Sequence, residues 1–506
     1  MSRELPPEVQ EYQEEKELGE KRGGQGKTPT LTESVGVVVA IAGVITVCIL
    51  MLGLDAHIPI FLCVLFVTVL GLRLKNTWEH LEAGFVSAIN ASMSAFFILM
   101  LVGILVGVWM ISGVISTMID YGLAILSPKI FLIATYVICS IVALATGTSW
   151  GTAASIGVAL VGVGAGLGIP AGMTGGAIVA GAYFGDKMSP LSDTTNLAPA
   201  VSGAKLYDHI GAMIYTTGPT WILAGAAFIV LSLLYGGGDF DPTRVNQIRE
   251  ALASVQKIHP LLLLPPLCVI GMALLKIPAV PGMFVGIVMG ALCGMVIQGV
   301  GFVDMMTAAN YGYEGAVSAE VFGEEIAELV NGLLTRGGLQ NMMWTISLSW
   351  MAIGFGGMLE AVGYLHVILH AVVNYMNRVG NLVTATLASC FAVNLLIGDQ
   401  YLAIILPGRL FKPAYEELGL EPRMLSRTLE DAGTLTSPLV PWNACGAYMA
   451  GTLGIPTLTY APYAILNWLN PFVSAFIAYA GFKIFWREGY GPAAKSDAVP
   501  AAGTGK

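Results

Sequence analysis

Long uncharged runs recur along the chain, and each is long enough to cross a membrane as a helix. Three examples are the segments 35–54, 210–238 and 379–398. A helix needs roughly 20 mostly apolar residues to span the hydrocarbon core of a bilayer. The pattern therefore predicts an all-α polytopic membrane protein, for which we expect about 11 to 13 transmembrane helices.

One polar stretch interrupts this pattern. Residues 181–203 read GAYFGDKMSPLSDTTNLAPAVSG and follow a charge-free run that begins at residue 130. Residues 433–451 read GTLTSPLVPWNACGAYMAG, so that Ser-Pro-Leu recurs at Ser189 and, 248 residues later, at Ser437. Polar segments at membrane depth are tolerated where they line a cavity or are buried in protein. We therefore predict two repeats, each with a broken or re-entrant Ser-Pro segment near the midplane of the membrane.

This repeat suggests a division of the whole chain. The expected segments are a disordered cytoplasmic tail (1–34), a first transmembrane repeat (35–235), an aqueous linker (236–260), a second transmembrane repeat (261–486) and a cytoplasmic tail (487–506). Basic residues gather before the first span and after the last one, which places both termini in the cytoplasm by the positive-inside rule. If each repeat has an odd number of spans, the two Ser-Pro segments enter from opposite faces as inverted repeats.

Composition excludes several classes of protein. Hydrophobic residues make up 55% of the chain and charged residues 11%, against about 25% charged residues in soluble domains. The net charge of −9 and the absence of a basic patch argue against nucleic-acid binding. Seven scattered cysteines without a CxxC pair indicate neither disulfides nor a metal site. We see no nucleotide loop or nucleophile constellation, and we expect neither an enzyme nor a cofactor.

The polar stretch supplies ligands for a small hard cation. Asp193 offers a carboxylate, and Thr194 and Asn196 offer neutral oxygens beside it, with Thr195 between them. Such ligands suit sodium and not a soft metal. The same carboxylate can hold a proton instead, so that one acid could exchange the two cations. The alternative is structural: Asp193 would cap a half-helix through its first backbone N–H groups.

Three other acidic sites at membrane depth are candidates for coupling. Asp186 adjoins Lys187, with which it could instead form a structural ion pair. Asp399 occupies the place that Thr148 holds in the first repeat, so the two could face each other across a crossing, unless Asp399 only caps a helix. The pair Glu430-Asp431 could simply lie at the surface. The full set of candidate ion-binding or coupling residues is Thr148, Ser149, Asp186, Ser189, Asp193, Thr194, Thr195, Asn196, Asp399, Asp431, Ser437 and Asn443.

Four motifs resemble a known family. GTSWGT at 147, GAYFGDKMSPLSDTTN at 181, LYDHI at 206 and LEDAGTLTSPLVPWN at 429 are similar to the NhaC family of bacterial sodium/proton antiporters, in the ion-transporter superfamily. The resemblance covers about residues 35 to 485, but the acidic loop at 312–337 does not match the family pattern. It implies inverted repeats, re-entrant hairpins, a transport domain moving against a scaffold, a homodimer and a place in the bacterial cytoplasmic membrane.

The expected function is secondary active exchange of sodium for protons by alternating access. A branch of the resembled family looks like sodium-linked malate/lactate exchangers, so the alternative is sodium- or proton-coupled transport of a small organic anion. In that case the N-termini of half-helices at the two Ser-Pro breaks would hold the carboxylate. A channel is less favoured, because duplicated broken segments serve alternating access better than continuous conduction.

Overall fold

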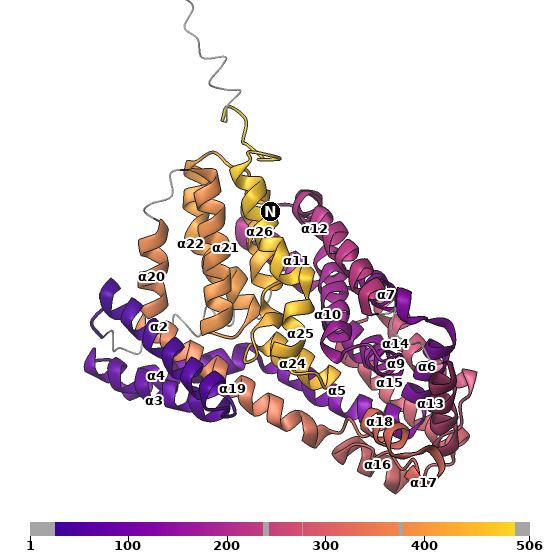
Figure 1. Ribbon diagram of the computed structural model, residues 1–506. Coiled ribbons are helices and arrows are strands. Elements are labelled where there is room, and N and C mark those ends of the chain that lie inside the picture. The colour runs from indigo at the N-terminus through magenta and orange to yellow at the C-terminus, as the bar shows by residue number, and fades with distance from the viewer. Residues whose placement is uncertain (1–25, 236–241, 276, 374–377, 491–506) are drawn as a thin grey trace, which may run out of the picture.

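The protein is built from helices (Figure 1). The computed structural model describes most of the chain, namely residues 26–235, 242–275, 277–373 and 378–490. Within these ranges no β-strand forms, and the only β-pairing consists of two isolated bridges. The predicted all-α class is therefore confirmed. Most of both expected tails, at 1–25 and 491–506, and the first part of the expected linker, at 236–241, lie outside the described residues.

The first half of the chain folds into short and long helices in succession. They are α2 (Leu31–Ile45, continued by the π-helical turn η1, Thr46–Met51), α3 (His57–Arg73), α4 (Trp78–Ala91), α5 (Met93–Ile111), α6 (Val114–Ile125), α7 (Pro128–Thr146), α8 (Ser149–Thr152), η2 (Ala153–Gly157), α9 (Val158–Gly166), α10 (Ala171–Met188), α11 (Asp193–Ser202) and α12 (Leu206–Tyr235). Local sequence fixes several starts. Thr30 and Glu33 form a reciprocal capping box before α2, and Pro128 opens α7 where its missing N–H is not needed.

The second half begins with the segment that we expected to be an aqueous linker, and it ends at the last apolar helix. Its helices are α13 (Pro242–Val255), η3 (Pro260–Leu263), α14 (Leu264–Leu274), α15 (Ala279–Cys293), η4 (Gly294–Gln298), α16 (Phe302–Tyr311), α17 (Ala319–Phe322), α18 (Glu324–Leu334), α19 (Leu339–Val362), α20 (Tyr364–Val373), α21 (Val379–Leu396), α22 (Gln400–Glu417), α23 (Pro422–Leu429), η5 (Glu430–Thr434), η6 (Ser437–Leu439), α24 (Ala444–Leu453), α25 (Thr457–Tyr460), η7 (Ala461–Tyr463) and α26 (Ile465–Tyr479).

Eight described helices are long and apolar enough to cross a membrane, and nine if the pair formed by α13 and η3–α14, bent by 93°, is one span. The three example runs correspond to α2, α12 and α21, as predicted. Three shorter apolar helices are α3, α6 and α26. The chain is a multi-pass membrane protein, and our number of 11 to 13 spans stays a prediction.

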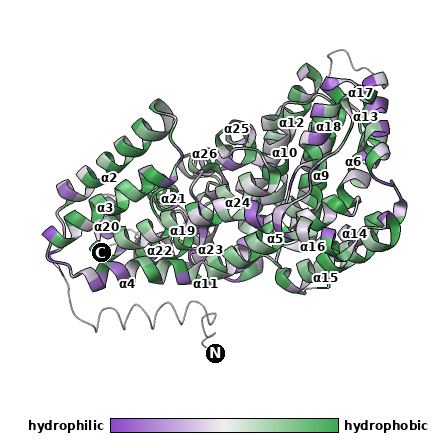
Figure 2. Ribbon diagram, turned by 90° about the horizontal axis from the view of Figure 1, so that it is seen from below, coloured by the Kyte–Doolittle hydropathy of each residue, from purple (hydrophilic) through white to green (hydrophobic). Residues whose placement is uncertain are grey.

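Segments far apart in the sequence pack side by side. On one side of Figure 1, α3 and α4 lie against α19, and α2 lies against α20. On the other side, α7 packs along both α10 and α12. The helices α24, α25 and α26 lie between the two sides, so the end of the chain is placed against its first half. Hydrophobic residues cover outer helices such as α2, α3 and α15 in Figure 2, as expected of surfaces that face lipid.

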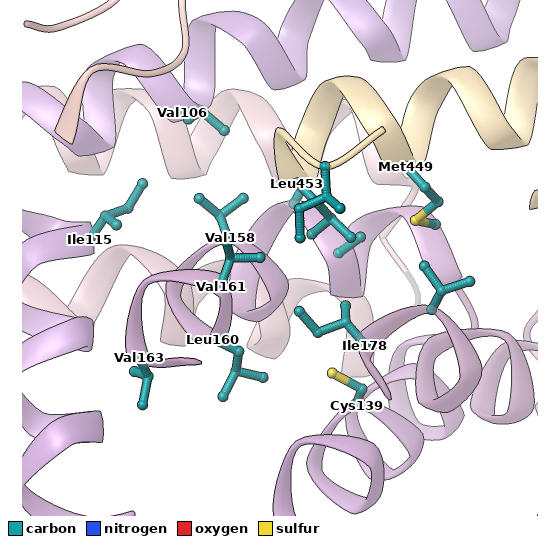
Figure 3. Packing of buried hydrophobic residues seen from close by; sticks show 14 of the residues in the cluster. Val106, Ile115, Cys139, Val158, Leu160, Val161, Val163, Ile178, Met449 and Leu453 are labelled. Atoms are coloured by element: carbon teal, nitrogen blue, oxygen red, sulfur yellow. The ribbon is translucent and has the colours of Figure 1, made fainter. Parts of the chain in front are cut away.

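The largest buried apolar cluster joins the two halves (Figure 3). Met449 and Leu453 of α24 lie beside Val158 of α9 and Ile178 of α10 in this cluster. These side chains expose no more than 2% of their surface. Close packing of this kind fixes the position of α24 relative to the first-half helices that surround the Ser-Pro break.

Two pairs of glycines mark matching breaks in the two halves. Gly147 follows α7 and Gly398 precedes α22, and both have the left-handed backbone that disfavours other residues (φ 71° and 76°). Gly203 ends α11 and Gly454 ends α24 in the same conformation (φ 87° and 64°). Both members of each pair are separated by 251 residues. The repeat predicted from Ser-Pro-Leu is thus visible in the backbone around each break.

The segment that we expected to be an aqueous linker is more structured than its polarity suggests. Its helix α13 buries Val245 and Ile248 and packs against α6 and α18. The acidic loop at 312–337 contains α17 and α18, and Arg244 of α13 forms an ion pair with Glu325 of α18 at 2.9 Å. The two segments therefore form one small layer of packed helices.

Candidate functional site

The first break brings Asp186 to the GTSWGT segment. Asp186 lies near the end of α10 and is 6% exposed. Its Oδ2 accepts hydrogen bonds from the backbone N–H of Ser149 at 3.0 Å and from the Ser149 hydroxyl at 2.7 Å. Because Thr148 caps the short helix α8, the Ser149 N–H lies at a helix N-terminus that favours a carboxylate. The other oxygen of Asp186, Oδ1, is buried and has no hydrogen-bond partner.

Lys187 reaches across to the second half of the chain. Its Nζ lies 2.5 Å from Oδ1 of Asp431, and both side chains are 0% exposed. Thr216 of α12 and Asn470 of α26 also donate to this carboxylate oxygen, at 3.1 and 2.8 Å. The ion pair that we considered between Asp186 and Lys187 is therefore wrong, because the lysine is paired with an acid 244 residues away. Arg427 lies one helical turn before Asp431 and is also fully buried.

Glu430 is a buried carboxylate without a hydrogen bond. It is 0% exposed, and neither of its carboxylate oxygens has a hydrogen-bond partner. The ion pair between Lys187 and the adjacent Asp431 lies next to it, and Thr434 is on the same π-helical turn. The suggestion that Glu430 and Asp431 lie at the surface is wrong. The π-helical turn η5 that carries them packs against α10, α11, α21, α22 and α26.

The predicted sodium ligands lie on the first turn of α11. Asp193 and Asn196 are exposed, whereas Thr194 and Thr195 are buried. Asp193 accepts from the Thr194 backbone N–H at 2.8 Å and from the hydroxyl of Tyr401 of α22.

The cap that we considered for Asp193 is borne out in part: Ser192 is the N-cap residue of α11, but Asp193 does accept from the Thr194 N–H in its first turn. The Asn196 amide donates to the carbonyls of Pro190 and Ser192, and Thr195 donates to the Lys187 carbonyl at 2.9 Å. Sodium coordination by Asp193, Thr194 and Asn196 stays a prediction.

Asp399 caps α22. Its Oδ1 accepts from the Leu402 N–H and its Oδ2 from the Ser92 hydroxyl, both at 2.9 Å. Thr148 caps α8 in the matching way, with its hydroxyl accepting from the Gly151 N–H. The two residues thus occupy equivalent positions in the two breaks, but their side chains bond to their own surroundings and not to each other. The helix-cap interpretation of Asp399 is confirmed.

The remaining candidates support the backbone of the breaks. Ser189 accepts from the Leu191 N–H at 3.3 Å, and Ser437 donates to the Thr434 carbonyl at 2.7 Å. Asn443 caps α24 and donates to the side-chain oxygen of Asn394 at 3.0 Å. These three polar side chains are fully buried. Their bonds hold the non-helical turns in place, as expected of irregular backbone inside a membrane protein.

Sequence reasoning did not find the partners of the buried charges. Lys187, Thr216, Asn470 and Tyr401 were not candidates, and Glu430 was noted only beside Asp431. The position of Lys187 beside Asp186, in a segment otherwise poor in charge, was the available signal. Its true partner follows only from the packing of α10 against η5.

Paired helix breaks, several charges buried between two halves and lipid-facing helices around them define a secondary transporter and not an enzyme. Comparison with known proteins agrees. Residues 181–482 match the sequence pattern of the Na+/H+ antiporter family. The chain belongs to this family.

Three relatives span nearly the whole chain. It is 38% identical over 468 residues to the Na+/H+ antiporter NhaC of Alkalihalophilus pseudofirmus, covering 92% of this chain and 97% of that protein. The malate-2H+/Na+-lactate antiporter of Bacillus subtilis is 36% identical, with 91% and 96% covered. The arginine/ornithine antiporter ArcD of Halobacterium salinarum is 37% identical, with 88% and 92% covered. The resemblance inferred from the four motifs is therefore confirmed.

Proposed function

We propose that this protein exchanges sodium for protons across the bacterial cytoplasmic membrane by alternating access. The observation that carries the proposal is a buried charge cluster with an excess of acids. We define this buried charge cluster as Asp186, Glu430, Asp431, Lys187 and Arg427, five side chains that expose no more than 6% of their surface.

The cluster would carry one net negative charge if all five groups were ionised. Uncompensated charge inside a protein costs several kcal/mol by order of magnitude, on the order of 3–5 for a broken buried pair. One bound sodium or one bound proton neutralises the excess negative charge, whereas both together would make the cluster positively charged. Competition for a single negative charge is the physical requirement for exchanging the two cations.

The experiment is flux in proteoliposomes that contain the purified protein. An outward sodium gradient is imposed at constant pH, and the internal pH is followed with a fluorescent dye. We expect the interior to acidify when sodium leaves, and protons to leave when the gradient is reversed. Choline chloride in place of sodium chloride is the control. No proton movement under either sodium gradient would refute the proposal.

A second candidate is coupled transport of a small organic anion such as malate or lactate. Similarity to the malate-2H+/Na+-lactate antiporter favours it. So does Arg427, whose Nε and Nη2 are buried without a hydrogen-bond partner, because a guanidinium with free donors can hold a carboxylate. Proton movement that requires added malate or lactate, and that is lost in Arg427→Met, would select this candidate over exchange of sodium and protons alone.

We also propose that both termini are cytoplasmic and that the two breaks open to opposite faces. The basic residues near both chain ends and the matching glycines at the two breaks support this arrangement. Ser189 and Ser437 are buried, so cysteines at the nearby positions Leu191 and Pro441 are the better probes. In a cysteine-free background, an impermeant reagent added outside should label one of the two preferentially. Equal labelling of both from one side would exclude inverted breaks.

A homodimer remains a further proposal, suggested by the resemblance to the superfamily. The measurement is the mass of the protein in nanodiscs, where a particle of twice the chain mass is expected. A monomer that retains full exchange activity would exclude the dimer as a requirement for function.

A further inference from the structure

We propose that the exchanged cation binds between Asp186 and Glu430, one carboxylate from each break, with the hydroxyls of Thr434 and Thr194 as neutral ligands. The assignment rests on the exchange activity proposed above and locates the site within it. It shares Thr194 with the group on α11 that the sequence suggested, but it replaces the exposed Asp193 with two buried carboxylates.

The first argument is the unmet hydrogen-bonding capacity of these oxygens. Both carboxylate oxygens of Glu430, Oδ1 of Asp186 and the hydroxyl oxygen of Thr434 are buried without a partner. Leaving a buried charged group without partners is far more costly than leaving a neutral one, so such groups are normally paired or bind an ion. Four unpartnered oxygens in one region therefore indicate a site for a cation.

The second argument is that two separate breaks place these groups together. Asp186 ends the first-repeat helix α10, and Glu430 begins η5, which packs directly against α10 and α11. Lys187, which follows Asp186, pairs with Asp431, which follows Glu430, so the two carboxylates flank one buried ion pair. Thr434 lies on the same turn η5 as Glu430, and Thr194 lies on α11, which packs against η5. Two neighbouring buried acids cannot both stay ionised unless a cation or a proton lies between them. The site is thus formed only when both repeats contribute.

The third argument excludes Asp431 as the main ligand. Its Oδ1 already accepts from Lys187, Thr216 and Asn470, and the lysine neutralises its charge. Asp431 and Lys187 form an anchor between the repeats. Oδ2 of Asp431 has no partner, but Glu430, the adjacent residue, lacks a hydrogen bond at both carboxylate oxygens, so Glu430 is left to bind the cargo.

The ligand set also indicates the class of cation. Carboxylate and hydroxyl oxygens are hard ligands that favour sodium or lithium over soft transition metals. In the described part of the chain, no three histidine, cysteine or acidic side chains converge as they would around a resident metal ion. An exchanged cation must also leave, and two carboxylates with two hydroxyls can release it when a proton takes its place.

The experiment measures sodium binding to purified full-length protein. Thermal unfolding midpoints are recorded in detergent over a range of sodium chloride concentrations, with choline chloride keeping the ionic strength constant. Bound ligand raises the midpoint in a concentration-dependent way, so the titration yields an apparent Kd. The variants are Glu430→Gln, Asp186→Asn and Thr434→Val, and Glu325→Gln is the matched control because that carboxylate is 77% exposed.

We expect Glu430→Gln and Asp186→Asn each to raise the sodium Kd by about tenfold or more, since each removes one charge from the site. Thr434→Val should raise it a few-fold, and Glu325→Gln should not change it. Without sodium, Glu430→Gln should be at least as stable as the unaltered protein, because it removes an unpartnered buried charge. This last result confirms folding of the variant independently of its sodium affinity.

Wild-type sodium affinity in folded Glu430→Gln would overturn the assignment. So would loss of sodium binding in Asp193→Asn with unchanged binding in Glu430→Gln, which would move the site to α11. If Thr434→Val folds but Glu430→Gln does not, an unchanged sodium Kd in Thr434→Val overturns the assignment of the site. The flux assay separates these outcomes from failure of the function, because exchange by the unaltered protein shows that the activity exists wherever the ion binds.

Discussion

The buried pair of Lys187 and Asp431 gives the sharpest stability prediction. Both side chains are 0% exposed, and their atoms Nζ and Oδ1 are 2.5 Å apart. Removing one partner of a buried pair leaves the other uncompensated, which costs about 3–5 kcal/mol, whereas replacing both is often nearly neutral. We therefore expect Lys187→Met and Asp431→Asn each to lose about 3–5 kcal/mol of stability. The double variant should recover most of that loss.

The assay compares unfolding of the four proteins in one detergent. Asp431→Asn keeps an oxygen that can accept from Thr216 and Asn470, so its loss reports mainly the stranded lysine. The matched control is Arg244→Met, which breaks an ion pair whose side chains are 41% and 77% exposed. Exposed pairs contribute only about 0–1 kcal/mol, so this variant should unfold close to the unaltered protein.

Two results would refute this reasoning. If the double variant is less stable than both single variants, the two side chains act independently and do not form a pair. If each single variant unfolds like Arg244→Met, the charges are solvated or neutral and the anchor between the repeats does not exist.

Three further predictions concern the breaks. Gly147→Ala should lose more stability than Gly168→Ala. Both positions have left-handed φ, which costs a non-glycine residue about 1–2 kcal/mol, but only at Gly147 would the new Cβ collide, because it would lie 2.6 Å from the Leu191 Cβ. Equal unfolding midpoints of the two variants would contradict this prediction. Asp399→Asn should preserve stability within about 1 kcal/mol, since Asn is an equally good helix cap, whereas Asp399→Ala should lose about 1–2 kcal/mol. Equal losses of the two variants in thermal unfolding would argue against capping. Ser149→Ala removes the 2.7 Å hydrogen bond that favours ionised Asp186, so Asp186 holds its proton more tightly. The pH profile of exchange should therefore move upward by about one pH unit. A downward shift of that profile in proteoliposome flux would contradict the prediction.

The sequence predicts the breaks well because their signals are local. Ser-Pro-Leu at 189 and 437 disfavours a continuous helix, and the glycines at 147 and 398 supply backbone that other residues adopt only with strain. A charge-free run long enough to span a bilayer is likewise readable from the chain alone. The class of the fold, the repeat and the family all follow from such features.

The arrangement of the buried charges could not be read in the same way. Whether Lys187 pairs with Asp186 or Asp431 depends on how α10 packs against η5, and adjacent residues in a helix point to different sides. Glu430 looked like a surface residue because two acids in a row are usually solvated. Its burial follows from the π-helical turn, against which seven helices pack, namely α10, α11, α12, α21, α22, α23 and α26.

Asp193 illustrates a different limit of sequence reasoning. Its neighbours Thr194 and Asn196 have the chemistry of sodium ligands, and this chemistry attracted the prediction. In the structure the Asn196 amide is used to bond carbonyls of its own turn, and the Tyr401 hydroxyl donates to Asp193. Residue type alone does not distinguish an ion ligand from a side chain that stabilises a turn.

The most direct test of exchange at one site is the number of protons released when sodium binds. Sodium is titrated into purified protein by calorimetry in buffers with different ionisation enthalpies, at several pH values. We expect about one proton released per sodium bound at low pH, falling towards zero at high pH, with the sodium Kd changing by up to about tenfold per pH unit where release occurs. Sodium binding with no proton release at any pH, in protein that still exchanges the two cations, would contradict competition for one negative charge.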